Sequence, residues 1–372
     1  MASSPSSEAP RIPLFKVHMP PRAALLPRLE DVLYSGQIGE GAAVVGFERE
    51  FGAFVGAAHC LAFSSGTAAL HTALMLAGVR AGDEVVSTPM TAEPTNLAIL
   101  HAGGTPVWAD VDPANGNVSA ATIAPCITSR TRAIVVVHYG GIPVDLAPVL
   151  ALAARHGLPV IEDAAHALGA RYAGRPIGTH SPFVMFSFQA IKHMTTVDGG
   201  MLAVADATLL PRGRRLRWFG IDRAAERTTV DVAEAGFKYH MNNVTATIGQ
   251  VQLAHIVPVI ARHIENGRYF DRALDGIADV ERCTWTPAAE PSYWFYTVLT
   301  DRPDDLSRHL AAHGIASSKA HRRNDAHPVF AASRRALPGV DRFFARMLHL
   351  PCGWWVTDED RDHIVDVMRR GW

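Results

Sequence analysis

The sequence predicts an α/β protein with a largely parallel sheet and a second, smaller α/β domain at its C-terminal end. Between His59 and about residue 205, short apolar runs alternate with helical patterns, and this alternation is typical of βαβ units. The apolar runs are hydrophobic on both faces, as strands covered by helices on both sides require. From about Ala278 the sequence changes to short strand patterns and amphipathic helical runs, which indicates the second domain.

The expected elements follow one another without internal repeats. Strand-like runs are HCLAFSS, EVVST, TPVWADVD, AIVVVHYGG and PVIEDAA, and helical patterns between them include TAALHTALMLAG and DLAPVLALAARHG. After Asp206 the pattern is helical, most clearly from Met241 to Ile264, and this stretch is expected to bridge the domains. The final helix begins after Thr357, where a hydroxyl and an acidic first turn suit a helix N-terminus. We predict three segments: a disordered lead over residues 1–12, a large domain over 13–265 and a small domain over 266–372.

Composition limits the classes of function. The 372 residues carry 35 Lys and Arg against 36 Asp and Glu, a formal net charge of -1, so no overall positive field exists to hold nucleic acid or an anionic membrane. The longest apolar runs are broken by His, Gly or Pro well before the ~20 residues that a membrane helix requires. The four cysteines form no CxxC pair, which argues against a disulfide framework and a zinc site. A soluble cytoplasmic protein is expected.

The first candidate site is the stretch SSGTAAL, Ser64 to Leu70, where a strand ends in small hydroxyl residues and a glycine and a helix begins at once. Unpaired backbone N–H groups at a helix N-terminus, together with hydroxyls, suit a phosphate. Ser65, Gly66 and Thr67 are therefore candidates for phosphate binding. An ordinary helix N-cap explains the same residues, so this motif alone leaves both interpretations open.

Two further motifs place ionisable side chains after predicted strands. Asp163 in EDAAH follows the strand PVI and lies near its C-terminal end, where open α/β sheets bind ligands; capping of the next helix is the alternative. Lys192 follows the strand pattern FSF and precedes the turn TTVDGG. A lysine desolvated there would have a lowered pKa and a nucleophilic amine, and the alternative is a solvated loop lysine.

Together the three motifs contain the parts needed to hold pyridoxal phosphate. The helix N-terminus would take the phosphate, Asp163 would keep the pyridine nitrogen protonated and Lys192 would form the Schiff base. Four blocks, SSGTAAL, EDAAHALGA, FSFQAIKHMTTVDGG and GFKYHMNNVTATIGQVQL, resemble the DegT/DnrJ/EryC1/StrS family of sugar aminotransferases. The resemblance runs from about residue 20 to the C-terminus. It implies fold type I of the pyridoxal phosphate enzymes, with a mostly parallel seven-stranded sheet between helices in the large domain.

The resemblance also carries residue roles over to this sequence. It implies that Lys192 and Asp163 are catalytic and that the cofactor is bound by Ser65, Gly66, Thr67, Asp163, His166, Ser187, Lys192 and Lys238. His166 stands where the family usually has a glutamine near the phenolic oxygen of the cofactor, and an imidazole can make the same hydrogen bond. The family is dimeric, and Lys238 is expected to reach the phosphate in the neighbouring subunit. A homodimer with shared active sites is therefore expected.

One position departs from the family pattern. Where relatives carry an aromatic residue that stacks on the cofactor, the segment PMTAEP has Ala92. Either another residue covers the ring or that face is more open, and the adjacent Glu93 is an acid near the site or a charge at a helix N-terminus. Related dehydratases have a histidine in place of the lysine, so Lys192 favours transamination. His193, directly after it, is interpreted as a supporting or surface residue.

The resemblance implies an aminotransferase that moves an amino group from L-glutamate to a ketone of a nucleotide-linked keto-deoxysugar. Three alternatives stay open: the same chemistry on a free keto-cyclitol or another secondary-metabolite ketone, a non-transaminating enzyme on the same scaffold, and a cofactor-binding protein without turnover. Candidate substrate residues are Ala92, Glu93, His321 and Arg322. Arg322 and Arg323 would bind a diphosphate or form a solvated basic loop. His321 and His327 lack a third ligand in the sequence, so no metal site is expected.

Overall fold

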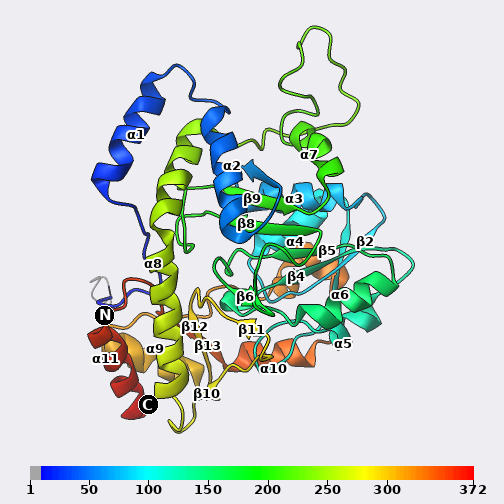
Figure 1. Ribbon diagram of the computed structural model, residues 1–372. Coiled ribbons are helices and arrows are strands. Elements are labelled where there is room, and N and C mark those ends of the chain that lie inside the picture. The colour runs from blue at the N-terminus through cyan, green and yellow to red at the C-terminus, as the bar shows by residue number, and fades with distance from the viewer. Residues whose placement is uncertain (1–9) are drawn as a thin grey trace, which may run out of the picture.

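A seven-stranded sheet forms the centre of the larger part of the molecule in the computed structural model, which describes residues 10–372 (Figure 1). Its strands lie in the order β1 (Cys60–Phe63), β9 (Gly200–Val204), β8 (Phe183–Ser187), β5 (Val160–Asp163), β4 (Thr131–Val137), β2 (Glu84–Ser87) and β3 (Thr105–Trp108). β9 pairs antiparallel with both of its neighbours, and the other pairs are parallel. The predicted α/β fold with a mostly parallel seven-stranded sheet is confirmed.

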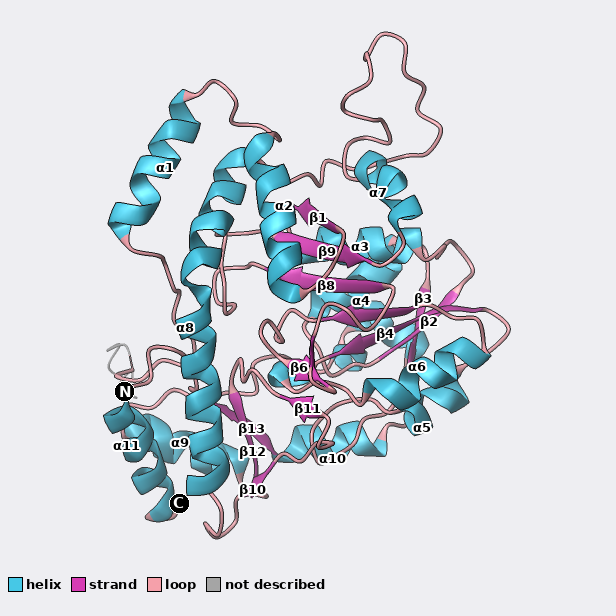
Figure 2. Ribbon diagram, in the orientation of Figure 1, coloured by secondary structure: helices cyan, strands magenta, loops and turns pink. Residues whose placement is uncertain are grey.

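Helices cover both faces of this sheet because its strands are apolar on both sides (Figure 2). One face is covered by α2 (Ala42–Val55), α6 (Leu146–Arg155) and α8 (Asn243–Ala273), and the other by α3 (Gly66–Leu76), α4 (Glu93–His101) and α7 (Leu210–Leu216). Within β4, Ile134 and Val136 belong to the first core, whereas Ala133 and Val135 belong to the second. The period of two that defines a strand therefore divides its side chains between two cores.

A second sheet lies in the C-terminal part and consists of β10 (Glu281–Arg282), β12 (Tyr296–Leu299) and β13 (Met347–Leu350). With α9 (Pro303–Ala312) and α11 (Asp358–Arg369) it encloses a separate core, while α10 (Pro338–Arg346) packs on the main core. The long helix α8 contributes Ile256 to the main core and Phe270 to the second one. The predicted boundary between residues 265 and 266 falls inside this helix, so one rigid element links the two parts.

Short elements complete the chain. β6 (Arg171–Tyr172), β7 (Arg175–Pro176) and β11 (Ala289–Glu290) form a third small sheet that ties the segment before β12 to the larger part. The other helices are α1 (Arg22–Tyr34) and α5 (Ala120–Ile123), with 3-10 turns at Ala124–Cys126, Tyr139–Gly141, Ala207–Leu209, Asn324–Ala326 and Pro328–Ser333. Residues 1–9 of the predicted lead lie outside the described residues, whereas Ile12 is buried and pairs with Ile315. Ile12, at the end of the predicted lead, is therefore part of the fold.

Within residues 10–372, α8 is the one helix that is long and apolar enough by composition to cross a membrane. Of the 18-residue window of α8 that is apolar enough for a membrane span, 50% is buried inside the protein. The helix packs against α1 and α2. Burial of this kind is typical of a core helix in a soluble protein.

Candidate active site

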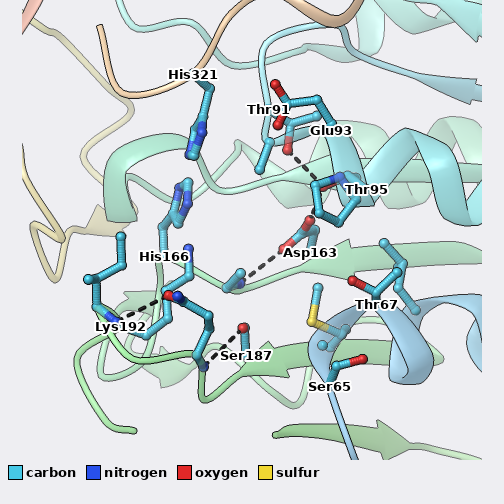
Figure 3. A pocket seen from close by; sticks show the side chains of 18 of the residues that line it. Ser65, Thr67, Thr91, Glu93, Thr95, Asp163, His166, Ser187, Lys192 and His321 are labelled. Atoms are coloured by element: carbon cyan, nitrogen blue, oxygen red, sulfur yellow. Dashed lines mark hydrogen bonds between the residues drawn. The ribbon is translucent and has the colours of Figure 1, made fainter. Parts of the chain in front are cut away.

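A cavity of about 360 Å³ lies at the C-terminal ends of β5 and β8, beside the N-termini of α3 and α4 (Figure 3). The residues singled out in the sequence that line it are Ser65, Gly66, Thr67, Ala92, Glu93, Asp163, His166, Ser187, Lys192 and His321. They come from separate segments of the chain. Parallel strands bring such segments together because their carboxyl ends meet at one edge of the sheet.

The first wall of the cavity is the N-terminus of α3. The side-chain oxygen of Ser65 caps this helix by accepting a hydrogen bond of 3.1 Å from the Ala68 N–H. Gly66 and Thr67 occupy the first turn, where backbone N–H groups have no partner within the helix. A Cβ atom at Gly66 would lie 3.1 Å from Ser187 Oγ, so the glycine keeps this space free. The helix N-terminus and the Ser187 hydroxyl thus face one small space that suits a phosphate group.

Asp163 is the last residue of β5, and it is buried. Thr95 Oγ1 donates a hydrogen bond of 2.7 Å to its Oδ2, and the Ala165 N–H donates one of 3.0 Å to its Oδ1. Burial raises the pKa of Asp163, whereas these donors and the charge of Lys192 oppose the rise. The carboxylate is therefore held in one orientation and would gain from a cationic partner such as a protonated ring nitrogen.

Lys192 lies in the segment that connects β8 and β9. Its backbone N–H donates a hydrogen bond of 3.0 Å to Gln189 O, and the Ile191 N–H donates one of 3.1 Å to Gln189 Oε1. Burial lowers the pKa of the Lys192 amine to about 7, and the Asp163 carboxylate opposes this effect. A large fraction of the amine is neutral near pH 7, and a neutral amine can attack a carbonyl carbon.

Two imidazole rings stand above Lys192 in Figure 3. The His166 ring stacks on Trp294 with a centroid distance of 3.9 Å and an interplanar angle of 17°, and the His321 ring is parallel to it at 5.8 Å. Burial lowers the pKa of His166 well below its usual value and that of His321 to about 4. Both rings are neutral near pH 7. Within residues 10–372, His166 Nδ1 has no hydrogen-bond partner, which leaves it available to a group in the cavity.

The segment before α4 forms another wall. Ala92 precedes the helix and lines the cavity, so this wall carries a methyl group where the resemblance implied a departure from an aromatic residue. Glu93 begins α4 and also lines the cavity. Its Oε1 lies 3.3 Å from His327 Nε2. Glu93 is therefore both an acid in the cavity wall and a charge at a helix N-terminus, so the two interpretations do not exclude each other.

Four positions discussed in the sequence do not line this cavity. Lys238 Nζ lies 4.9 Å from the centroid of the Trp218 ring. Arg322 is exposed, and Arg323 forms ion pairs with two nearby aspartates. His193 is buried, and its Nε2 contacts a backbone oxygen at 3.1 Å. His193 therefore supports the turn that carries Lys192 and does not face the cavity.

Among the residues that sequence reasoning missed are Thr95 and Trp294, which line the cavity, and Asn324, which supports its wall. Thr95 holds Asp163, Trp294 lies against the Lys192 amine and Asn324 joins its loop to the segment before α4. Thr95 had a signal, since it stands in the first turn of a helix that follows a predicted strand. Trp294 and Asn324 lie in distant segments with no motif of their own.

Comparisons with known proteins identify relatives of this chain. A model of the DegT/DnrJ/EryC1/StrS aminotransferase family matches residues 22–369. The crystal structure of the sugar aminotransferase CalS13 from Micromonospora echinospora is 41% identical, covers 97% of this chain and 100% of that chain, and has a TM-score of 0.93. The spore coat polysaccharide biosynthesis protein SpsC from Bacillus subtilis (strain 168) is 32% identical over 357 residues, 91% of this chain and 92% of SpsC. The PLP-form of Spr1654 from Streptococcus pneumoniae is 24% identical, covers 96% of this chain and 98% of that chain, and shares the fold with a TM-score of 0.89.

Proposed function

The chain belongs to the DegT/DnrJ/EryC1/StrS aminotransferase family, and from this premise we propose that it moves an amino group from L-glutamate to the ketone of a nucleotide-linked keto-deoxysugar. It is a pyridoxal phosphate-dependent aminotransferase. The observation that most directly supports the proposal is that one cavity brings together a helix N-terminus, the Asp163 carboxylate and the Lys192 amine.

The residues of the cavity fit pyridoxal phosphate. Gly66 and Thr67 would bind the phosphate through their backbone N–H groups, with the hydroxyls of Ser65 and Ser187 beside them. Asp163 would pair with the protonated ring nitrogen. The unpartnered Nδ1 of His166 would meet the phenolic oxygen, and Lys192 would hold the cofactor covalently through its amine.

Lys192 is also placed to move the proton that amino transfer requires. When bound, pyridoxal phosphate supplies a carbonyl that takes up the donor amino group and a ring that spreads negative charge away from the donor Cα. Because the pKa of Lys192 is lowered to about 7, its Nζ is able both to accept the Cα proton and to return it. Asp163 meanwhile keeps the ring nitrogen charged.

The acceptor would enter on the side of Ala92, Glu93 and His321. The small side chain of Ala92 leaves room there, and the Glu93 carboxylate can accept hydrogen bonds from sugar hydroxyl groups. Arg322 is exposed beside His321 and would bind a nucleotide diphosphate from outside the cavity.

One observation favours the alternative acceptor, a free keto-cyclitol. Among the described residues that line the cavity, no arginine is present, and Arg323 is already engaged by Asp325 and Asp341. An acceptor without a diphosphate would need no such cation.

The proposal also includes a cytoplasmic homodimer in which Lys238 of each chain approaches the phosphate of the other. Within its own chain Lys238 points at Trp218 and does not line the cavity. That position is consistent with a role in a second subunit.

The deciding experiment follows the absorption spectrum of the full chain loaded with pyridoxal phosphate. We expect a Lys192-dependent band that L-glutamate converts to the band of pyridoxamine phosphate, with release of 2-oxoglutarate, and we expect a nucleotide-linked keto-deoxysugar to restore the first band. Restoration by a keto-cyclitol alone would support the alternative. Normal turnover by Lys192→Ala would contradict the role of Lys192, and no response to L-glutamate would contradict the donor.

A further inference from the structure

Trp294 makes two contacts with the segment that carries the reactive lysine. Its indole N–H donates a hydrogen bond of 2.8 Å to the backbone oxygen of Ile191, and its ring centroid lies 3.8 Å from Lys192 Nζ. The Trp294 side chain therefore contacts both the backbone directly before Lys192 and the amine at the end of the Lys192 side chain. We infer that Trp294 is a positioning residue that fixes the Lys192 amine whenever that amine is not bonded to the cofactor.

Trp294 is rigid enough for this role. Its side chain is 1% exposed, and its ring stacks on His166 at 3.9 Å and on Phe15 at 4.7 Å. Phe15 belongs to the N-terminal segment, and Trp294 lies two residues before the start of β12. A ring packed between distant segments has few alternative rotamers, so its contacts with the turn at Lys192 are defined.

The Lys192 amine needs such a contact. Within residues 10–372, its Nζ makes no hydrogen bond and no ion pair, but it lies over the aromatic face of Trp294. An aromatic face attracts an ammonium group and leaves the lone pair of the neutral amine unused. A lysine that must leave the cofactor, act as a base and return would thus be kept near one position without being trapped by a carboxylate.

The charged and titratable groups around the amine act in different directions. The Asp163 carboxylate favours the ammonium form, whereas His166, His193 and His321 are neutral near pH 7 because burial lowers the pKa of each. The Trp294 ring adds its attraction to that of Asp163. Weakening the ring's negative face at constant shape should consequently lower the pKa of Lys192.

The test replaces Trp294 site-specifically with tryptophan analogues that carry one, two and four ring fluorines, which weaken the negative face and retain the N–H and the shape. The full chain is loaded with pyridoxamine phosphate, so the Lys192 amine is free, and its pH-dependent acetylation is measured by mass spectrometry. We expect the labelling midpoint to fall stepwise, by about half to one pH unit over the series. Trp108, which is buried and packs against Phe330, is the control position. A midpoint that stays constant across the Trp294 series would overturn the inference.

A second variant tests the hydrogen bond between the Trp294 indole and the backbone oxygen of Ile191. Trp294→Phe keeps an aromatic face near the amine but cannot donate to Ile191 O, so we expect kcat to fall about tenfold with little change in KM. The primary isotope effect with an α-deuterated donor should rise, because proton transfer is the step that depends on the position of the amine. An unchanged kcat and isotope effect would argue against positioning. The inference rests on the proposed role of Lys192. The labelling midpoint is measured without turnover, so a constant midpoint would overturn the role of Trp294 and leave the role of Lys192 intact.

Discussion

Burial acts in opposite directions on the two ionisable side chains at the centre of the cavity. It raises the pKa of Asp163 and lowers that of Lys192, because in both cases it disfavours the charged form. The hydrogen bonds from Thr95 and Ala165 counteract burial at Asp163. The carboxylate is thus supported in its charged form, while the amine is left with a free lone pair, and the proposed chemistry requires this combination.

Replacing Asp163 with asparagine tests the role of the negative charge on this carboxylate. Asp163→Asn keeps the shape and a polar group but removes the negative charge that would stabilise a protonated ring nitrogen, so we expect kcat to fall by about 10² or more with KM nearly unchanged. Steady-state kinetics measure both quantities. Thr95→Val, which removes only one donor to the carboxylate, should cause a smaller loss. An Asp163→Asn enzyme with a raised KM and a normal kcat would show that the carboxylate serves binding instead.

The pH dependence of cofactor uptake tests the lowered pKa of the Lys192 amine. Only the neutral amine attacks a carbonyl, so the rate at which the cofactor-free full chain bonds to pyridoxal phosphate should rise roughly tenfold per pH unit and level off above the pKa of Lys192. Burial lowers that pKa to about 7 from the ordinary lysine value of 10.5. Stopped-flow absorbance gives the rates. Pyridoxal without its phosphate is the control, because the phosphate itself titrates near pH 6. A rate that still rises between pH 8 and pH 10 would contradict the lowered pKa.

At the scale of elements, the junction between α3 and β9 decides the shape of the phosphate space. A Cβ atom at Gly200, in β9, would lie 2.5 Å from Ser65 O and 2.6 Å from Gly66 N. Both contacts are with backbone atoms, which cannot move aside as a side chain can. The absence of a side chain at Gly200 therefore allows the start of α3 to approach the sheet.

Gly200→Ala should displace the N-terminus of α3. We expect the dissociation constant for pyridoxal phosphate to rise by at least about tenfold and the free energy of unfolding to fall by about 1–3 kcal/mol. Equilibrium titration and urea unfolding measure the two effects. Gly39→Ala is the matched control, because its Cβ would meet only Arg223 Nη2 at 3.5 Å and its backbone is not left-handed. Unchanged cofactor affinity in Gly200→Ala would mean that α3 does not form the phosphate site.

The elements of the site differ in how far local sequence predicts them. The strand-to-helix junction at Ser65 and the acid at the end of β5 were predictable, because each depends on residues within a few positions. Trp294 donates to a residue 103 positions earlier, and Asn324 donates to the Thr91 oxygen 233 positions earlier. Such contacts arise from the packing of distant segments, which local periodicity does not encode. The ion pair of Arg323 with Asp341, 18 positions later, likewise depends on packing between segments.

At the scale of the whole molecule, several large apolar side chains remain outside the core. Tyr34 is 85% exposed at the end of α1, Ile38 is 54% exposed in the following loop, and Val197 is 60% exposed in the turn after Lys192. Val197 also has a φ of 75°, a strained conformation for a β-branched residue. The segment after α7 projects from the body in Figure 1. Exposed apolar side chains of this kind are what the proposed homodimer would cover.

Subunit mixing tests whether two chains share each active site. Lys192→Ala removes the reactive amine of its own chain, and Lys238→Glu places a negative charge where the proposed dimer brings a cation to the phosphate of the other chain. Each variant alone should lose activity by about 100-fold or more, because the former lacks the amine and the latter repels the phosphate. When the two differently tagged variants are co-expressed in equal amounts, half of the dimers are mixed, and each mixed dimer regains one intact site of two.

Total activity in the mixture should therefore reach about a quarter of that of the unaltered enzyme, because the intact site combines Lys192 from one chain with Lys238 from the other. The mixed dimers purified through both tags should show about half the activity per chain. Two Lys192→Ala chains carrying the same pair of tags are the control and should stay inactive. Full activity in Lys238→Glu alone would remove Lys238 from the site. No recovery in purified mixed dimers would mean that Lys238 acts within its own chain, and the cavity would then be complete in one subunit.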